Sequence, residues 1–202
     1  MEATTARRCP SRERYSPLCH DSVYRSSVKL KEGRIALVID TGSRGNLCSD
    51  SWGQAMERAC NAYGPQVERT KRLRPLTVTG VGKQDQVCDE DWKFPIAMPL
   101  EEGRVMPCSY ISPVIKDSGI PALLGLNTLK TMGAVIDCKT FKIYLPGPEG
   151  HKHLPCEGTK VLQAECSESG HMLVPCDEFA RLLAQPREAE PAKVVSLTSN
   201  TH

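Results

Sequence analysis

The sequence predicts an all-β fold with one or two short helices. Three segments, 76–82, 86–98 and 104–115, alternate apolar and polar residues and are separated by glycines. The chain of 202 residues contains 15 Gly and 15 Pro, a composition that favours turns and short strands over long helices. A further segment, RIALVID at 34–40, is an apolar run that ends on an acid. Such a run is typical of a strand buried on both faces.

Two elements are expected before the three alternating segments. Residues 27–30 and 34–39 flank the tripeptide KEG and predict a hairpin that turns at Gly33. Apolar residues at helical spacing predict a helix over about 50–63, which Gly64 ends.

Three elements are expected after those segments. Asn127 is expected to cap a helix of one to two turns, and the segments AVID and FKIYL predict a hairpin over 134–145. The segment 177–185 is expected to be helical with Asp177 as its N-cap.

Changes in composition divide the chain into four regions. Residues 1–26 are polar and rich in Arg and Ser, and we expect a disordered tail there. The main domain is expected at 27–147, because the pattern of strand signals ends at a Gly-Pro pair. A small C-terminal extension at 148–185 and a second disordered tail at 186–202 follow.

Charge and hydropathy exclude several classes of partner. The net charge of +2 gives no strong field that would attract nucleic acid, and no apolar run approaches the ~18 residues of a membrane span. We therefore expect neither nucleic acid nor a membrane as partner. The N-terminus lacks the apolar core of a secretory signal, which favours an intracellular, cytoplasmic protein, with organelle targeting as the alternative. The basic run 67–75 indicates a solvated loop or, alternatively, a phosphate-contacting patch.

The ten cysteines are scattered and never form a C-x-x-C pair. Reduced structural thiols are expected in an intracellular chain, with a disulfide framework as the alternative. Cys166, His171 and Cys176 provide three of the four positions of a zinc knuckle, but Gln163 occupies the fourth. Because structural zinc needs four ligands, we expect no metal and no cofactor.

The tetrapeptide Asp40-Thr41-Gly42-Ser43 directly follows the apolar run. D-T-G is also an ordinary turn sequence, so the tripeptide alone carries little information. The position of the tripeptide is more informative, because the end of a buried strand holds a carboxylate rigidly and shields it from water. A second segment, ALLGLN at 122–127, contains Gly125, which permits a very close approach of another backbone. Between them lies a glycine turn at 80–82 that is flexible enough to act as a cover.

In this order, ALVIDTGS, the turn at 80–82 and ALLGLN resemble the retropepsin-type aspartic proteases of retroviruses and retrotransposons. The resemblance covers residues 27–147. It implies a small closed acid-protease barrel with a C-terminal appendage, and aspartic endopeptidase activity without a cofactor.

Family members carry one D-T-G per chain and act as homodimers, and D-T-G occurs once in this chain, although a D-S-G also stands at 117–119. The resemblance thus implies that two copies place Asp40 side by side, share one proton and activate a water molecule. The substrate implied is a peptide bond of a retroelement polyprotein. The other residues implied are active-site support (Thr41, Gly42, Ser43), the flap that binds substrate (Gly80, Val81, Gly82) and a structural segment behind the site (Leu123, Leu124, Gly125).

Two positions depart from the family's pattern. Viral members usually carry acids shortly after D-T-G and an Arg after the later glycine, and these groups pair and stiffen the dimer. Arg44 and Leu126 stand nearest those positions here. The alternative function is therefore a catalytically inactive dimerisation or binding module of the same fold, a transposon remnant. A zinc-dependent nucleic-acid binder that uses 67–75 and the Cys/His-containing C-terminal part is the third hypothesis.

Three other groups receive structural interpretations. Asp137 also ends an apolar strand and is expected to start the turn at CKT. The acidic run 89–91 is expected to be a solvated hairpin edge. Cys48 has no histidine nearby in the sequence to activate it, so a buried structural thiol is expected.

Overall fold

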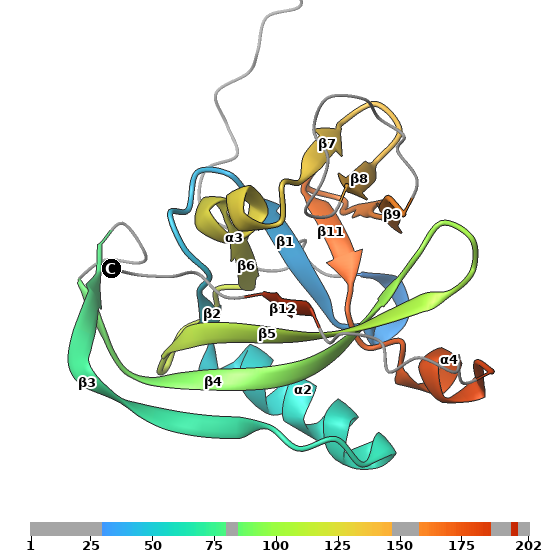
Figure 1. Cartoon of the computed structure of the whole chain (residues 1–202). Helices are drawn as coiled ribbons and strands as arrows, with labels where there is room; N and C mark the ends of the chain where they lie inside the picture. The colour runs from blue at the N-terminus through green and yellow to red at the C-terminus, as the bar shows by residue number, and fades with distance from the viewer. Residues whose placement is uncertain (1–29, 80–84, 147–157, 187–194, 198–202) are drawn as a thin grey trace, which may run out of the picture.

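The strands of the protein lie in three sheets (Figure 1). The computed structural model describes residues 30–79, 85–146, 158–186 and 195–197. The first sheet has the order β10-β11-β1-β6 and contains β1 (Ala36–Asp40), β6 (Ala122–Gly125), β10 (Glu165–Cys166) and β11 (Met172–Pro175).

The second sheet is the largest and has the order β12-β5-β4-β3, with the short β2 also paired to β5. Its strands are β2 (Cys48–Ser49), β3 (Glu68–Val78), β4 (Gln86–Pro99), β5 (Val105–Ile115) and β12 (Val195–Leu197). The third sheet has the order β7-β8-β9 and contains β7 (Val135–Asp137), β8 (Lys142–Leu145) and β9 (Lys160–Gln163).

Helices are few, so the all-β prediction with short helices is confirmed. They are the 3-10 turn η1 (Lys31–Gly33), α2 (Asp50–Tyr63), α3 (Leu126–Thr131) and α4 (Phe179–Ala184). The predicted helix at 50–63 and the predicted hairpin at 134–145 are present, the latter as β7 and β8. Within the described residues, no helix combines the length and apolar character needed to cross a bilayer.

Helix α2 begins and ends where its sequence predicts. The Ser49 hydroxyl accepts a hydrogen bond from the Trp52 backbone N–H at 3.2 Å, and Gly64 adopts the left-handed conformation with φ 97°. The helix buries Gly53, Met56 and Cys60 against the second sheet. A Cβ on Gly53 would lie 2.9 Å from the Trp92 ring, so the absence of a side chain allows the helix to approach β4 closely.

An aromatic cluster joins α2 to the second sheet and to β1. The ring centroids of Trp52 and Phe94 lie 5.1 Å apart in an edge-to-face arrangement, and Tyr110 lies 5.7 Å from Trp52. The Trp52 indole N–H donates to the Ala36 carbonyl at 3.1 Å. The strand that carries Asp40 is therefore fixed to the main core at its first residue.

The expected hairpin before Asp40 differs from the structure. Residues 31–33 form a 3-10 turn, and β1 pairs with β11 on one side and β6 on the other. Residues 27–29 lie outside the described part. Strand β11 therefore pairs with β1 where residues 27–30 were expected to pair. Its sequence, MLVP, is at least as apolar as that of the expected strand.

Segments after residue 147 supply strands to all three sheets: β9 pairs with β8, β11 with β1, and β12 with β5. The predicted tail 1–26 lies outside the described residues. Of the predicted tail 186–202, the structure describes Pro186 and the three residues of β12.

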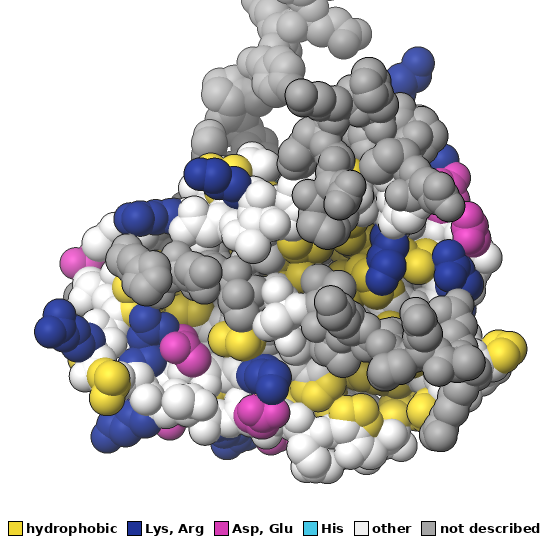
Figure 2. Space-filling view, in the orientation of Figure 1, with side chains coloured by type: hydrophobic (Ala, Val, Ile, Leu, Met, Phe, Trp, Pro, Cys, Tyr) yellow, Lys and Arg dark blue, Asp and Glu magenta, His cyan; other side chains and the backbone are white. Residues whose placement is uncertain are grey.

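The basic run 67–75 is a strand and not the expected loop. It forms most of β3, which pairs with β4 along one edge (Figure 1) and exposes most of its side chains (Figure 2). Arg69 pairs with Glu57 at 2.7 Å and stacks on the Trp92 ring, and Arg72 pairs with Asp91. Two of the four basic side chains of this run therefore form ion pairs with carboxylates of the same chain.

Two predicted helix caps are wrong. Helix α3 begins after Gly125 and not after Asn127, and the cap residue of α4 is Glu178. Asp177 instead accepts a hydrogen bond from the Ile35 backbone N–H at 2.9 Å. Asn127 lies inside α3, and its backbone N–H donates to the Arg44 carbonyl at 3.0 Å, so both expected cap residues instead make contacts with distant segments.

Candidate functional site

Asp40 is the last residue of β1, beside Gly125 of the parallel strand β6. The register pairs Ile39 with Leu124 and Val38 with Leu123, so the segment predicted to lie behind the site lies next to the strand that carries the acid. Leu37 is completely buried and Val38 nearly so, whereas Asp40 is half-buried. A buried strand therefore delivers a partly accessible carboxylate at its end.

The loop that follows holds one oxygen of this carboxylate. Asp40 Oδ1 accepts hydrogen bonds from the backbone N–H groups of Gly42 at 2.9 Å and Ser43 at 3.1 Å. Asp40 Oδ2 accepts no hydrogen bond from the residues that the structure describes. The Ser43 hydroxyl donates to the Gly45 carbonyl at 2.7 Å and braces the loop. The carboxylate is thus oriented through one oxygen and leaves the other open to a ligand or to water.

Gly125 allows the Asp40 loop, residues 41–46, to lie against β6. A Cβ on Gly125 would meet the Gly45 carbonyl oxygen at 2.2 Å and the Gly45 carbonyl carbon at 2.3 Å, closer than real Cβ contacts come. Next to it, the Leu126 N–H donates to the Ser43 carbonyl at 2.8 Å. The close backbone approach expected at Gly125 is therefore present.

Asn46, the last residue of the Asp40 loop, and Tyr110 of β5 hold the loop in place through side-chain hydrogen bonds. Neither role was predicted from the sequence. Asn46 is 3% exposed, and its side-chain oxygen accepts from the Gly125 N–H at 3.1 Å and the Thr128 hydroxyl at 2.9 Å. The Tyr110 hydroxyl donates to the Leu123 carbonyl at 2.9 Å, and burial raises the pKa of this phenol well above its ordinary value. An Asn in a loop and a Tyr in a strand carry no signal of such roles.

Thr41 and Gly42, two of the predicted support residues, are exposed at the tip of the loop, and Ser43 is half-buried. The predicted flap residues Gly80, Val81 and Gly82 lie outside the described residues.

The stem of the hairpin that carries the flap residues is described. Val78 pairs with Gln86 and Leu76 with Cys88. Both Leu76 and Val78 pack on a small apolar cluster that contains Leu47, Cys88 and Ile115, with Leu123 at its edge. The hairpin stem therefore packs against Leu47, which directly follows the Asp40 loop, and close to Leu123 of β6.

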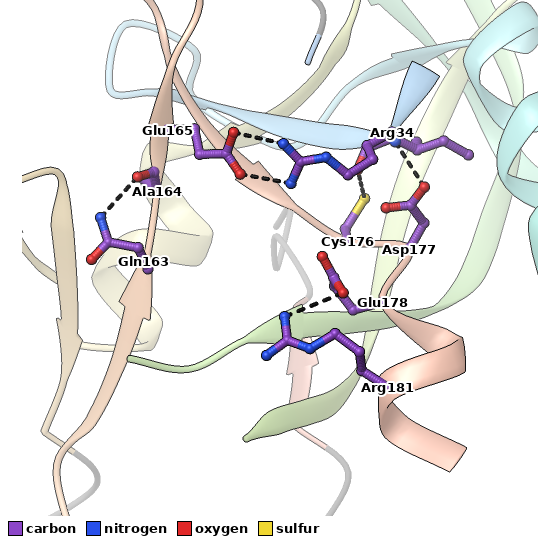
Figure 3. A network of polar contacts seen from close by, with 9 residues as sticks. Arg34, Gln163, Ala164, Glu165, Cys176, Asp177, Glu178 and Arg181 are labelled. Carbon is purple, nitrogen blue, oxygen red and sulfur yellow. Dashed lines mark hydrogen bonds and ion pairs between the residues drawn. The ribbon is translucent and has the colours of Figure 1, made fainter. Parts of the chain in front are cut away.

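A separate cleft lies near the other end of β1 (Figure 3). It has a volume of about 270 Å³. Arg34 in its wall makes two hydrogen bonds to Glu165, at 2.7 and 2.8 Å, and Arg181 pairs with Glu178 at 3.3 Å. The Glu165 contact is the main cause that raises the pKa of Arg34. Asp40 does not line this cleft.

Cys166, His171 and Cys176, the candidate zinc ligands that the structure describes, do not converge. Cys166 is exposed, the Cys176 thiol is buried and contacts the Ile35 carbonyl, and His171 Nδ1 lies 2.8 Å from the Ser169 hydroxyl. Among the described residues, no three His, Cys, Asp or Glu side chains are grouped to hold a metal ion.

The structural interpretations of Asp137 and Cys48 are confirmed, whereas that of the acidic run 89–91 is wrong. Asp137 accepts hydrogen bonds from Lys139 and Thr140 and so starts the turn at CKT. The acidic run lies in β4, which pairs with β3 on one side and β5 on the other, so it is not at a sheet edge, and its side chains are half-buried. Cys48 is completely buried, and burial raises the pKa of its thiol to about 12, which leaves it unreactive at neutral pH.

Comparisons with known proteins give likenesses to solved structures but none to sequences. No protein-family model matches the chain, and no curated protein sequence is similar to it. Among solved structures, the chain is similar to the retroviral protease-like domain of Ddi1 from Leishmania major, at 16% identity and a TM-score of 0.31. The match covers 57% of this chain and 90% of that domain. At that TM-score and identity we infer nothing about this chain from the likeness.

Proposed function

We propose that the chain is an aspartic endopeptidase that acts as a homodimer, with Asp40 as its catalytic residue. The observation that carries the proposal is the pairing of Asp40 with Gly125 at the ends of two buried parallel strands. The order of ALVIDTGS, the turn at 80–82 and ALLGLN, which resembles the retropepsins, supports the same function.

A second carboxylate has to come from another copy of the chain. Acid catalysis of this type needs two adjacent carboxyl groups that hold one proton between them. The sequence contains no second D-T-G, and its one D-S-G, at 117–119, begins at Asp117, an exposed turn residue after β5 that does not end a buried strand. A two-fold axis beside the Asp40 loop brings the two Asp40 side chains together, because a two-fold interface places the same surface of both copies in contact.

The proposed reaction is hydrolysis by an activated water. The ionised Asp40 removes a proton from a water molecule between the two carboxyls, and the water oxygen attacks the carbonyl carbon of the peptide bond. The protonated Asp40 of the other copy donates its proton to the carbonyl oxygen. The ionised Asp40 of the other copy then takes a proton back from one hydroxyl of the resulting diol as the C–N bond breaks, and the amine leaves with a proton from the first carboxyl. The products are one new carboxyl and one new amino terminus.

The contacts around Asp40 suit this chemistry. The amides of Gly42 and Ser43 fix one carboxylate oxygen, so the other keeps a constant position toward the water. The β3–β4 hairpin, whose stem packs beside the loop, is the proposed cover over an extended peptide. The proposed substrate is a retroelement polyprotein, since the resemblance to the retropepsins implies it.

The exposed residues around the loop form the proposed contact between copies. Thr41 and Gly42 are exposed, and Leu126 exposes 47% of its surface directly after Gly125. An apolar Leu126 contact takes the place of the ion pair that stiffens viral dimers.

The test replaces Asp40 with Asn and measures cleavage of unstructured peptides and of the intact chain at mildly acidic pH. Asp137→Asn is the matched control, because Asp137 also ends a strand and accepts hydrogen bonds from the turn that follows it. We expect loss of cleavage, by about a thousandfold or more, in the first variant only. Equal cleavage by wild type and Asp40→Asn overturns the proposal.

A second candidate function is a dimerisation or binding module without catalysis. The departures at Arg44 and Leu126 favour it, because they remove the ion pair expected in an active viral dimer. A chain that dimerises in sedimentation experiments but cleaves no peptide at any pH, with or without Asp40→Asn, supports this alternative.

A further inference from the structure

The Asn46 side chain joins four separate segments below the Asp40 loop. Its amide N–H₂ group donates to the carbonyls of Ile111 at 2.9 Å and Leu197 at 3.0 Å. Its oxygen accepts from the Gly125 N–H and the Thr128 hydroxyl. The two carbonyls that bond the amide nitrogen and the two donors that bond the amide oxygen together fill the hydrogen-bonding capacity of the side chain. One of the four partners, Leu197, belongs to the short strand β12.

Strand β12 lies on the edge of β5, in line with β2. Its register is parallel and pairs Ser196 with Ser109 and Leu197 with Tyr110. The Leu197 side chain is completely buried in the main core, whereas Ser196 is exposed and its hydroxyl lies 3.1 Å from that of Ser109. Among the described contacts, the attachment thus consists of one anchoring side chain, three backbone pairs, the Ser196–Ser109 hydroxyl contact and the Asn46 contact.

We propose that the edge of β5 is a strand-docking site for residues 195–197, and that its occupancy controls the Asp40 loop. With β12 docked, Asn46 has all four partners and holds Gly125 against Gly45. With β12 released, the Asn46 amide loses the Leu197 carbonyl, and the core loses the Leu197 side chain beside Tyr110. Both losses fall on the two residues that support the loop. Control of cleavage by this strand rests on the proposed function, whereas control of loop order does not.

The size and position of β12 fit a strand that can detach. It has three residues and pairs along one edge only, so its docking involves little surface and few hydrogen bonds. Recognition of an extended segment by a sheet edge, with one apolar side chain in a pocket, is a common mode of peptide binding. The chemistry that the site selects is a short extended peptide with a leucine at the position of Leu197.

Hydrogen exchange of the full chain tests the coupling from β12 to the loop. Leu197→Ala weakens the anchor, and Leu183→Ala, at a side chain that is 66% exposed on α4, is the matched control. We expect the Gly125 amide, which donates to Asn46, to exchange about tenfold faster in Leu197→Ala than in wild type. Amides of β9 serve as the internal reference. An unchanged Gly125 amide, with faster exchange confined to β5, overturns the proposal.

Coupling between two sites is reciprocal, so a change in Asn46 must also release β12. Asn46→Asp keeps both hydrogen bonds that the side chain accepts but faces the Ile111 and Leu197 carbonyls with a negative charge. We expect amides of residues 195–197 to exchange about tenfold faster in this variant. Unchanged exchange of β12 contradicts the coupling.

A peptide supplied in trans tests the docking site itself. Leu197→Asp expels the chain's own strand, because a carboxylate does not enter an apolar core. The synthetic peptide KVVSLTS, residues 193–199, is expected to bind this variant and restore the slow exchange of the Gly125 amide. The same peptide with Asp in place of Leu is the control. If Leu197→Asp does not fold, fluorescent wild-type peptide is titrated onto Leu197→Ala, and absence of saturable binding overturns the proposal.

Cleavage assays separate this inference from the proposed function. If Asp40→Asn abolishes cleavage and Leu197→Ala lowers it about tenfold, both stand. If Asp40→Asn leaves cleavage unchanged, the protease proposal fails, while the exchange experiments still decide whether β12 controls the loop.

Discussion

Gly125 is the residue whose side chain the fold tolerates least. Its φ of −80° is open to any amino acid, so space and not backbone conformation requires glycine here. The space is filled by Gly45, whose carbonyl oxygen would lie 2.2 Å from a Cβ. The close approach therefore depends on the absence of a side chain at Gly125.

Gly125→Ala is expected to lower the free energy of unfolding by about 3 kcal/mol, because the Asp40 loop has to move away from β6. Gly119→Ala is the control, since a Cβ there has no atom within 4 Å. Urea denaturation of both variants measures the difference. Equal stability of the two variants would show that the loop does not lie against β6.

The cysteines differ in the reactivity that their surroundings allow. Burial raises the pKa of Cys48 and Cys108 to about 12 and that of Cys60 to about 11, whereas Cys138 and Cys166 are exposed. With an alkylating reagent at pH 8, we expect the two exposed thiols to react at least about a hundredfold faster than the three buried ones. Mass spectrometry of the native chain over time measures the rates. Early labelling of Cys48 contradicts the core as described.

At the scale of elements, Asp177 connects the segment before α4 to the start of β1. Its carboxylate accepts from the Ile35 N–H, and burial is the main cause that raises its pKa above the ordinary value of 3.8. The folded chain therefore holds this proton more tightly than the unfolded chain does. The stabilisation is fully present below the unfolded pKa and is lost as the pH rises through the folded pKa.

Asp177→Asn removes this titration, so the variant should gain stability relative to wild type as the pH rises from 3 to 7. Asp137→Asn should behave oppositely. The Thr140 hydroxyl is the main cause that lowers the pKa of Asp137, so its contribution is present above pH 3.8 and lost on acidification. Denaturation at several pH values gives both slopes. A parallel pH dependence for the two variants would contradict these assignments.

Most elements of the fold follow from local sequence, but their partners do not. Ser49 and Gly64 mark the ends of α2, and the alternation over 86–98 gives β4 within a residue of its observed bounds. The pairing of β1 with β11 joins residues more than 130 positions apart, and several apolar segments could have taken that place. The errors at Asn127 and Asp177 have the same origin, because both helices are six residues long and packing fixes where they begin.

For the candidate site, the sequence predicts which residues make close backbone contacts. The adjacency of Asp40 and Gly125 follows from two apolar runs that both end at the site. Asn46 and Tyr110, which hold the arrangement through side-chain hydrogen bonds, could not be predicted, since their partners come from β5, β6 and β12. Local pattern therefore indicates the acid but not the network that orients its loop.

At the scale of the whole molecule, the proposed dimer depends on the exposed surface beside Asp40. Leu126→Asp places a charge there and is expected to raise the dimer dissociation constant about tenfold or more. Leu183→Asp, on α4, is the control for added charge at an exposed leucine. Sedimentation across a concentration series measures both constants. Dimers of equal strength in the two variants would place the contact elsewhere.

The most direct test of the paired Asp40 residues mixes wild type with Asp40→Asn in equal amounts, at constant total concentration, after exchange of subunits. If catalysis needs Asp40 from both copies, only one dimer in four retains both, and the cleavage rate falls to about one quarter of the wild-type rate. A rate of about one half would mean that each copy acts alone, and the account of a shared carboxyl pair would be contradicted.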